Sequence, residues 1–176
     1  MILIGIGSNL AAAGYASPLD TAAAAVARLP GVGIAVLRRS RWYTSQPVPP
    51  SDQPWYVNGV VAVEAALGPM ALLEALLAVE AEFGRHRSVP GAARTLDLDL
   101  LDYHGTRCNG ERLLLPHPRL HERRFVLLPL AELAPQWRHP RLGKTVAELL
   151  AAVPAAEQPV HALGDQGDPR DDPVRA

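Results

Sequence analysis

Residues 94–101 read RTLDLDLL, in which leucine alternates with aspartate. In a β-strand, successive side chains point to opposite faces of the sheet. A strand here therefore places its leucines on one face, which suits a hydrophobic core, and Asp97 and Asp99 on the other. The pattern predicts a strand that is buried on one side and anionic on the other.

Asp97 and Asp99 are the candidate metal ligands. Their backbones stand roughly 7 Å apart on a strand and their side chains point the same way, so their oxygens can bracket one or two divalent cations. Aspartate is depleted in strands, and like charges on one face destabilise a sheet, which favours a bound cation. The alternative is a half-buried strand whose solvent-exposed face happens to carry aspartates.

Arginines cluster near this pair in the sequence. A guanidinium group matches phosphate oxygens with two parallel hydrogen bonds. Carboxylates that hold metal, together with arginines, indicate a site for a polyphosphate. The arginines close in sequence are Arg85, Arg87, Arg94, Arg112, Arg119, Arg123 and Arg124.

The composition suits one domain with a hydrophobic core, because the chain has 176 residues and 48% of them are hydrophobic. A net charge of −1 provides no basic field, so we expect no nucleic-acid partner. No apolar run approaches the length of a membrane span, and the apolar residues 2–6 are too few for a signal peptide. The single cysteine, Cys108, fits a reducing compartment. We expect a cytoplasmic monomer with no membrane contact.

Hydrophobic periodicity predicts both strands and helices along the chain. Strands are expected over residues 2–6, 34–43, 55–65 and 94–101, a hairpin over 104–115, and helices from residues 17, 69, 123 and 144. Gly5-Ile6-Gly7 is not a dinucleotide-binding fingerprint, because Leu10 occupies the position of its third glycine, and is interpreted as a tight loop at a strand end. From residue 154 prolines, aspartates and glycines replace the apolar period, which predicts a domain over residues 1–153 and a disordered tail over 154–176.

Two polar residues fall where the pattern calls for apolar ones. Glu80 lies on the apolar stripe of the helix that begins at residue 69, so its carboxylate needs an arginine or a hydrated metal as partner. Asn58 lies within a strand, where asparagine is disfavoured, and beside an aromatic residue it can read the edge of a flat heterocycle. A polar residue on a solvent-exposed face is the alternative for Asn58.

Several short motifs, taken together and in order, resemble the 6-hydroxymethyl-7,8-dihydropterin pyrophosphokinase family over roughly residues 2–150. The motifs are Ile6-Gly7-Ser8-Asn9-Leu10, Asp52-Gln53-Pro54 with Tyr56 and Asn58, Gly84-Arg85 with Arg87, Arg94-Thr95-Leu96-Asp97-Leu98-Asp99, and Pro116-His117 with Arg123 and Phe125. The resemblance implies an α+β, ferredoxin-like sandwich with a mostly antiparallel sheet and helices packed on it. It also implies transfer of pyrophosphate from ATP to the hydroxymethyl group of the reduced pterin, with release of AMP, in folate biosynthesis.

The resemblance also implies roles for individual residues. Asp97 and Asp99 would hold two Mg²⁺ ions that bridge the ATP phosphates, and with Arg85 and Arg94 would form the catalytic set. Tyr56 and Phe125 would sandwich the pterin ring, while Asn58, Ser45 and the backbone at Val48 complete the pterin pocket. The residues implied to bind the nucleotide are Arg85, Arg87, Arg94, Leu100, Arg112, His117 and Arg123.

The sequence departs from the family pattern around the nucleotide. The loop over residues 88–93 is a residue shorter than is common and lacks the Arg-Trp pair that closes over the substrates. Glutamine, threonine and tyrosine are common at three positions that hold Leu77, Leu114 and Pro118 here.

Two other functions are alternatives to this one. A ferredoxin-like module that binds RNA or a small metabolite is the alternative outside enzymes, although an RNA-binding sheet carries stacking aromatics on central strands and the aspartate face would repel RNA phosphate. A different metal-dependent phosphoryl or nucleotidyl transferase is the alternative among enzymes, since the aspartate pair alone would serve it.

Overall fold

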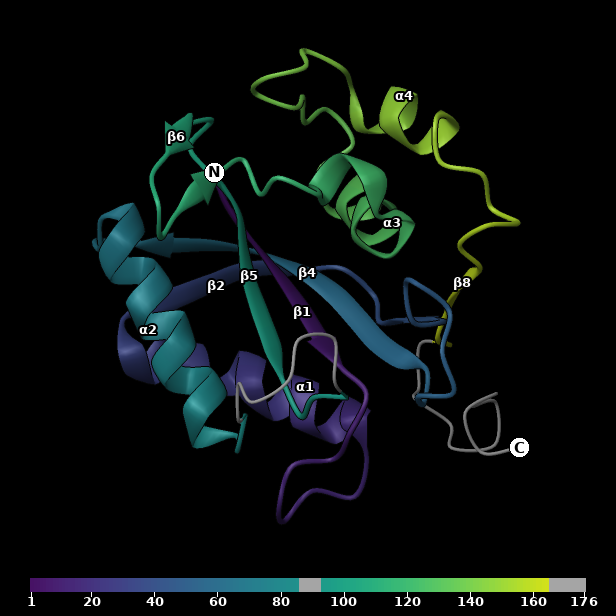
Figure 1. The fold of residues 1–176 in the computed structure, drawn as a ribbon. Coiled ribbons are helices and arrows are strands. Elements are labelled where there is room, and N and C mark those ends of the chain that lie inside the picture. The colour runs from purple at the N-terminus through teal and green to yellow at the C-terminus, as the bar shows by residue number, and fades with distance from the viewer. Residues whose placement is uncertain (86–92, 165–176) are drawn as a thin grey trace.

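A central antiparallel sheet carries helices on both faces, and the computed structural model describes residues 1–85 and 93–164 (Figure 1). The strand order is β5-β1-β4-β3-β8, and β2 also pairs with β4. Every pairing in this sheet is antiparallel. The strands are β1 (Ile2–Ser8), β2 (Ile34–Arg39), β3 (Tyr43–Ser45), β4 (Tyr56–Ala65), β5 (Asp97–Tyr103) and β8 (Val160–Ala162).

The helices begin where the sequence signals predicted. Ser17 caps α1 by accepting a hydrogen bond from the Asp20 N–H, and Thr145 caps α4 in a reciprocal pair with Glu148. None of the described helices is long and apolar enough to cross a membrane. The helices are α1 (Pro18–Arg28), α2 (Pro69–Glu82), α3 (Arg124–Leu133) and α4 (Val146–Ala151), with 3₁₀ turns at Leu29–Val32 and Leu120–Glu122.

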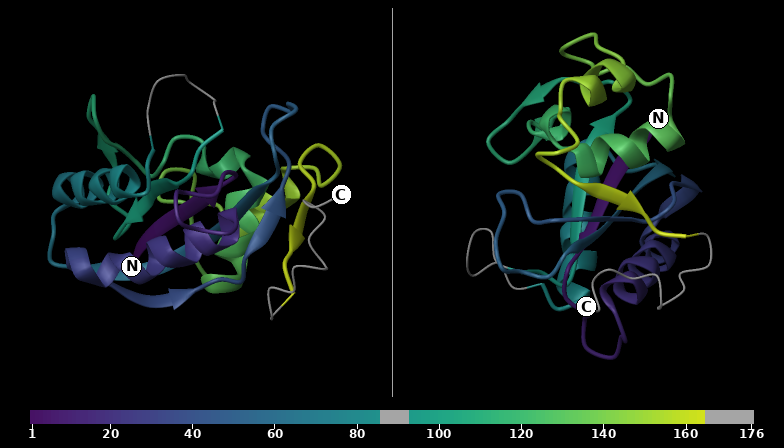
Figure 2. Two further views of the ribbon diagram at one scale, coloured as in Figure 1. Left: turned by 90° about the horizontal axis from the view of Figure 1, so that it is seen from below. Right: turned by 90° about the vertical axis from the view of Figure 1, so that its right-hand side faces the viewer.

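The sheet separates two hydrophobic cores. Along β1 the side chains alternate, so that Ile2, Ile4 and Ile6 pack under α1 and α2. Leu3 points to the other face, where α3 and α4 cover it. Figure 2 shows these two helical layers from two further directions. Helix α3 covers only part of this face of the sheet. The cavity that forms the candidate site lies on the same face, beside the start of α3.

The strand predicted over residues 34–43 is two strands, so that prediction is wrong in one respect. Both β2 and β3 pair with β4, but the register shifts between them. The Ser40 hydroxyl accepts the Val60 N–H at 3.1 Å, and a Cβ added at Gly59 would lie 2.8 Å from the Trp42 ring. The indole therefore packs directly on the β4 backbone and interrupts the ladder at this point.

The segment that follows α4 also differs from the prediction. Residues 154–164 were predicted to be part of a disordered tail, yet β8 pairs with β3 along its whole length. The Leu163 N–H adds a further bond to the Trp42 carbonyl at 2.8 Å. The pairing partner is more than 100 residues away in sequence, so no local pattern predicts it. Residues 165–176 lie outside the described residues.

Candidate active site

The two aspartates of β5 lie beside two glycines of the neighbouring strand β1. Asp97 is paired with Gly7 and Asp99 with Gly5 of β1. A Cβ added at Gly7 would lie 3.7 Å from both the Asn58 Oδ1 and the Asp97 Cβ. Gly5 and Gly7 are thus inside β1, not in a loop at its end. The Leu101 side chain packs over Gly5, whereas the missing side chain of Gly7 leaves open space between Asn58 of β4 and Asp97 of β5.

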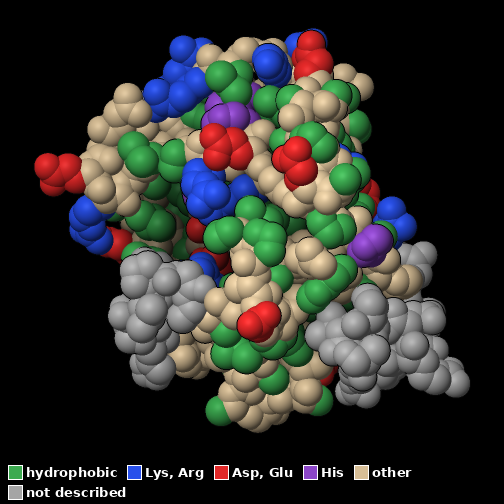
Figure 3. All heavy atoms as spheres, turned by 45° about the vertical axis from the view of Figure 1, so that its right-hand side comes forward, with side chains coloured by type: hydrophobic (Ala, Val, Ile, Leu, Met, Phe, Trp, Pro, Cys, Tyr) green, Lys and Arg blue, Asp and Glu red, His purple; other side chains and the backbone are tan. Residues whose placement is uncertain are grey.

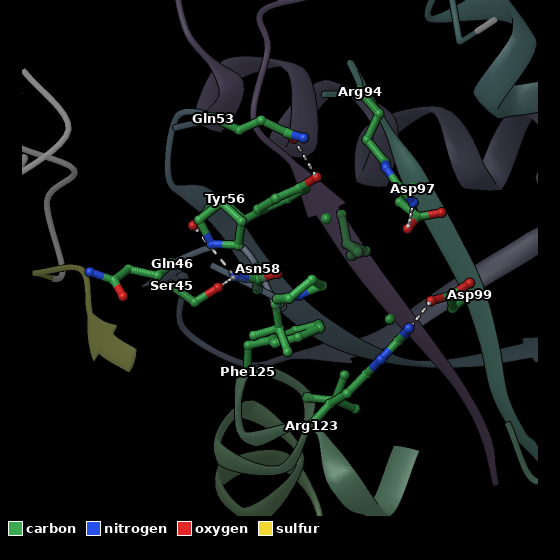
Figure 4. A pocket seen from close by; sticks show the side chains of 18 of the residues that line it. Ser45, Gln46, Gln53, Tyr56, Asn58, Arg94, Asp97, Asp99, Arg123 and Phe125 are labelled. Carbon is green, nitrogen blue, oxygen red and sulfur yellow. Dashed lines mark hydrogen bonds and ion pairs between the residues drawn. The ribbon is translucent and has the colours of Figure 1, made fainter. Parts of the chain in front are cut away.

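A cavity of about 220 Å³ occupies this space and brings together residues from five elements, β1, β3, β4, β5 and α3. In Figure 4, Ser45, Tyr56, Asn58 and Phe125 lie toward one side, and Arg94, Asp97, Asp99 and Arg123 toward the other. The Asn58 amide donates to the Ser45 hydroxyl at 2.9 Å, and Asn58 is 3% exposed. All five residues expected around the pterin line this cavity, namely Ser45, Val48, Tyr56, Asn58 and Phe125.

Arginines hold the first aspartate. Arg94 Nη1 donates to Asp97 Oδ2 at 2.8 Å, and Arg85 donates to both Asp97 Oδ1 and Glu80 Oε1. Glu80 is 2% exposed and also accepts the Leu98 N–H at 2.7 Å. The expectation that Glu80 needs an arginine or metal is met by Arg85, and Glu80 fixes the backbone between the two aspartates.

The second aspartate has more distant cationic neighbours. Arg123 Nη1 is 3.6 Å from Asp99 Oδ2, and the Arg123 guanidinium lies 5.6 Å from the centre of the Phe125 ring. His117 Nε2 is 3.9 Å from Asp99 Oδ2. Burial, followed by the charge of Asp97, raises the pKa of Asp99 to about 7. Burial, followed by the charge of Arg123, lowers the pKa of His117 to about 4, so His117 is neutral at pH 7.

The donor set fits a hard cation that keeps several other ligands. Mg²⁺ binds carboxylate oxygens and is commonly held by one or two carboxylates together with water and substrate phosphates. Among residues 1–85 and 93–164 there is no group of three or more His, Cys, Asp and Glu side chains suited to a metal. Asp97 and Asp99 would thus provide an open site. The charge of Asp97, which after burial raises the pKa of Asp99, is one that a cation would offset.

A second cavity, of about 400 Å³, lies on the far side of Asp99. Asp99 lines both cavities, and of the residues expected to bind the nucleotide, Leu100, Arg112 and His117 line this one. The Arg112 side chain is 64% exposed and pairs with Glu74 at 3.1 Å. Figure 3 shows basic and acidic side chains gathered near the middle of the face that this view presents. The residues that depart from the family pattern, Leu77, Leu114 and Pro118, all line this cavity.

The comparison with known proteins identifies the family. The sequence model of 7,8-dihydro-6-hydroxymethylpterin-pyrophosphokinase (HPPK) matches residues 3–135. The chain belongs to the HPPK family. It is 44% identical over 152 residues to the 2-amino-4-hydroxy-6-hydroxymethyldihydropteridine pyrophosphokinase of Synechocystis sp., which covers 86% of this chain and 75% of that protein. It is 42% identical over 153 residues to the Pseudomonas aeruginosa protein of the same name, covering 87% and 91%.

Solved HPPK structures share the fold. A crystal structure of an HPPK-DHPS in complex with substrates matches with a TM-score of 0.65 at 11% identity, over 86% of this chain and 43% of that longer one. A Plasmodium falciparum HPPK-DHPS matches with a TM-score of 0.61. The predicted α+β, ferredoxin-like sandwich with a mostly antiparallel sheet is therefore confirmed, as is the resemblance to HPPK.

One expected site residue lies outside the described residues, and some residues of the site were not expected from the sequence. Arg87 and most of the 88–93 loop lie outside the described residues, so the structure does not place them in the HPPK site. Gln53, which accepts from the Tyr56 hydroxyl at 3.5 Å, lines the first cavity but was given no role from sequence. Gly5 and Gly7 were also missed, although two glycines on one face of a strand are a signal for close approach.

The raised pKa of Asp99 makes the stability of this HPPK depend on pH. The folded chain holds the Asp99 proton more tightly than the unfolded chain does, so this contribution to stability is complete below about pH 4 and is lost as the pH rises to about 7. Asparagine does not titrate, so the Asp99→Asn variant should not lose this stability as the pH rises. We expect its melting temperature without Mg²⁺ to equal that of wild type near pH 4 and to exceed it at pH 8 by about 2–4 °C. This value is modest because the Asp99 side chain is one-third exposed and solvent screens it.

Melting curves of both proteins in EDTA from pH 4 to pH 8 measure this difference. The lowered pKa of His117 acts in the opposite direction, since it costs stability as the pH falls below about 6.5, but to first order it acts in both proteins and cancels in the comparison. An Asp99→Asn protein that melts below wild type at pH 8 would show that Asp99 contributes a structural contact instead.

Proposed function

We propose that this chain transfers the β,γ-diphosphate of ATP to the hydroxymethyl group of 6-hydroxymethyl-7,8-dihydropterin and releases AMP, a step of folate biosynthesis. Membership in the HPPK family supports the reaction. The observation that carries its assignment to this site is that Asp99 lines two cavities of different character. A flat heterocycle on one side and a nucleotide on the other would bring their reacting atoms together at Asp99.

The first cavity suits the pterin. Its aromatic residues, Tyr56 from β4 and Phe125 from α3, offer faces for a flat ring, and stacking on such faces is favourable. Asn58 and Ser45 supply amide and hydroxyl groups in a buried position, where hydrogen bonds discriminate strongly between heterocycle edges. The Val48 backbone completes this proposed pocket.

The second cavity and the arginines suit the triphosphate. Arg85, Arg94 and Arg123 lie beside the aspartates and would pair with phosphate oxygens. Leu100, Arg112 and His117 would contact the rest of the nucleotide. Arg87, expected from the sequence to join them, lies outside the described residues. Asp97 and Asp99 would hold two Mg²⁺ ions. Bound Mg²⁺ would offset the phosphate charge and orient the triphosphate.

The proposed chemistry is a displacement at the β-phosphorus of ATP. The hydroxymethyl oxygen forms a bond to that phosphorus, the bond to the oxygen that leads to the α-phosphate breaks, and the hydroxyl proton passes to solvent. The residues contribute by holding the hydroxyl and the phosphorus in line and by offsetting charge on the leaving AMP. Arg85 and Arg94 therefore act on turnover more than on pterin affinity.

The oligomeric state, compartment and partners that we propose are those expected from the sequence. We infer a monomer that acts on two small molecules in the cytoplasm, binds no nucleic acid and needs no membrane. A net charge of −1 and the acidic pair at the site's centre disfavour an RNA ligand.

Product analysis tests the reaction itself. The protein, incubated with ATP, Mg²⁺ and 6-hydroxymethyl-7,8-dihydropterin, should form AMP and pterin diphosphate in equal amounts, because attack falls on the β-phosphorus. Separation of the nucleotides by anion exchange measures it. The 6-methyl analogue of the pterin, which lacks the attacking oxygen, is the control and should yield no AMP. ADP with a pterin monophosphate would instead indicate attack on the γ-phosphorus and an ordinary kinase.

A further inference from the structure

The segment between α4 and residue 164 contacts elements on two sides of the first cavity without lining the cavity itself. This segment is outside residues 3–135, which match the family. In the right-hand view of Figure 2 it runs from α4 past α3 to the edge of the sheet. At the sheet, Val160 is paired with Ser45 of β3, and His161 stacks on Trp55 with ring centres 6.0 Å apart. The segment therefore contacts the strand that carries Ser45 and the loop that leads into Tyr56.

The same segment caps α3. The first N–H groups of a helix have no partner within the helix, and the N-cap residue of α3, Arg123, provides no side-chain hydrogen bond. Gln158 supplies it: its Oε1 accepts the Arg124 N–H at 2.9 Å, and its Nε2 donates to the Glu122 carbonyl at 2.8 Å. The Arg124 side chain in turn donates to the Val153 carbonyl at 3.0 Å.

This cap lies between two residues of the site. Arg123, which is 3.6 Å from Asp99, precedes the capped residue, and Phe125, which lines the cavity, follows it. The rest of α3 is held independently, because Val126, Leu127 and Leu130 are buried in the core with α4. Loss of the cap would thus loosen the first turn of α3 and leave the remaining helix packed.

We propose that residues 158–163, here named the strap, set the width of the pterin cavity by joining the first turn of α3 to β3, and that Gln158 is a positioning residue for pterin binding. The inference rests on the proposed function. The second cavity is formed by residues of α2, β5 and the segment over residues 111–118, none of which the strap contacts through a hydrogen bond described above. Of the residues proposed to bind the nucleotide, only Arg123 adjoins the cap. The strap should therefore act mainly on pterin affinity and change nucleotide affinity much less.

Gln158→Leu tests this, because leucine approximates the shape of glutamine but makes neither hydrogen bond. Calorimetric titration should show that the dissociation constant of 6-hydroxymethyl-7,8-dihydropterin rises about fivefold to tenfold, as expected for loss of a helix cap, while that of a non-hydrolysable ATP analogue changes less than about twofold. Gln158→Glu keeps the acceptor for the Arg124 N–H and should recover part of the pterin affinity. Gln136→Leu makes the same chemical change at an exposed position and should match wild type.

The results of these titrations distinguish a failure of the inference about Gln158 from a failure of the proposed function. Gln158→Leu with unchanged pterin affinity, or with equal losses for both ligands, overturns the inference. If Gln158→Leu does not fold, the Gln158→Glu protein carries the test, and equal losses for both ligands again overturn it. A wild-type protein that fails to bind the pterin overturns the proposed function and the inference with it, whereas wild-type binding with no effect of Gln158→Leu overturns the inference alone.

Discussion

Asp97→Asn and Asp99→Asn should each lower kcat for AMP formation by about 10³-fold or more, equivalent to roughly 4 kcal/mol of transition-state stabilisation. Asparagine keeps the size of aspartate but removes the charge that would hold Mg²⁺. Both side chains are on the open face of β5, while Leu98 and Leu100 on its other face are in the core, so the fold should persist. Steady-state rates with saturating ATP and pterin measure the effect, and circular dichroism checks the fold.

Glu64→Gln is the matched control for charge removal. Glu64 is exposed near the end of β4 that lies away from Tyr56, and its variant should turn over at the wild-type rate. Near-normal rates for both aspartate variants at low Mg²⁺ would sink the assignment of the metal ligands. Loss of activity in one variant only would assign the metal to a single carboxylate.

Phe125→Ala should weaken pterin binding by about 30-fold or more, since it removes both buried ring area and the offset stacking that adds roughly 0.5–1.5 kcal/mol. Tyr56→Ala, which removes the ring contributed by β4, should also weaken pterin binding. Titration with the pterin and, separately, with a non-hydrolysable ATP analogue separates the two sites. The nucleotide affinity should change little, because neither ring lines the second cavity.

Tyr56→Phe is the control for the ring itself. It keeps the aromatic face and loses only the long hydroxyl contact with Gln53, so pterin affinity should stay within about twofold of wild type. Equal losses for pterin and nucleotide in the alanine variants would indicate that the domain unfolds and would contradict a ring sandwich.

The features that the sequence predicted are those with a local signal. The alternation around Asp97 and Asp99 gives both the strand and its two faces, and β5 has them as expected. Ser17 before a proline, and Gly143-Lys144-Thr145 before an apolar run, predicted helix starts that the structure confirms. Glu80 on an apolar stripe predicted an arginine or a hydrated metal as its partner, and Arg85 is that partner. In each case the physics acts within a few residues of the pattern.

The features that were missed depend on contacts between distant residues. The break between β2 and β3 comes from Trp42 packing on Gly59, and β8 exists because β3 offers it an edge. Gln158 caps a helix that begins 34 residues earlier, at Arg124. An isolated glutamine in a proline-rich stretch carries no local signal for such a role, so composition alone indicated disorder.

If Asp97 holds Mg²⁺ as proposed, its pairing with Arg85 and Arg94 would make the binding of metal and nucleotide cooperative. A cation that approaches Asp97 alone must compete with two guanidinium groups already held there. When a triphosphate arrives with it, those guanidinium groups gain phosphate oxygens as partners, and Arg85 also retains Glu80. Because the coupling free energy is reciprocal, each ligand raises the affinity of the other by the same factor. On the proposed assignment, the free enzyme would discriminate against bare Mg²⁺ and select the metal–nucleotide complex as a unit.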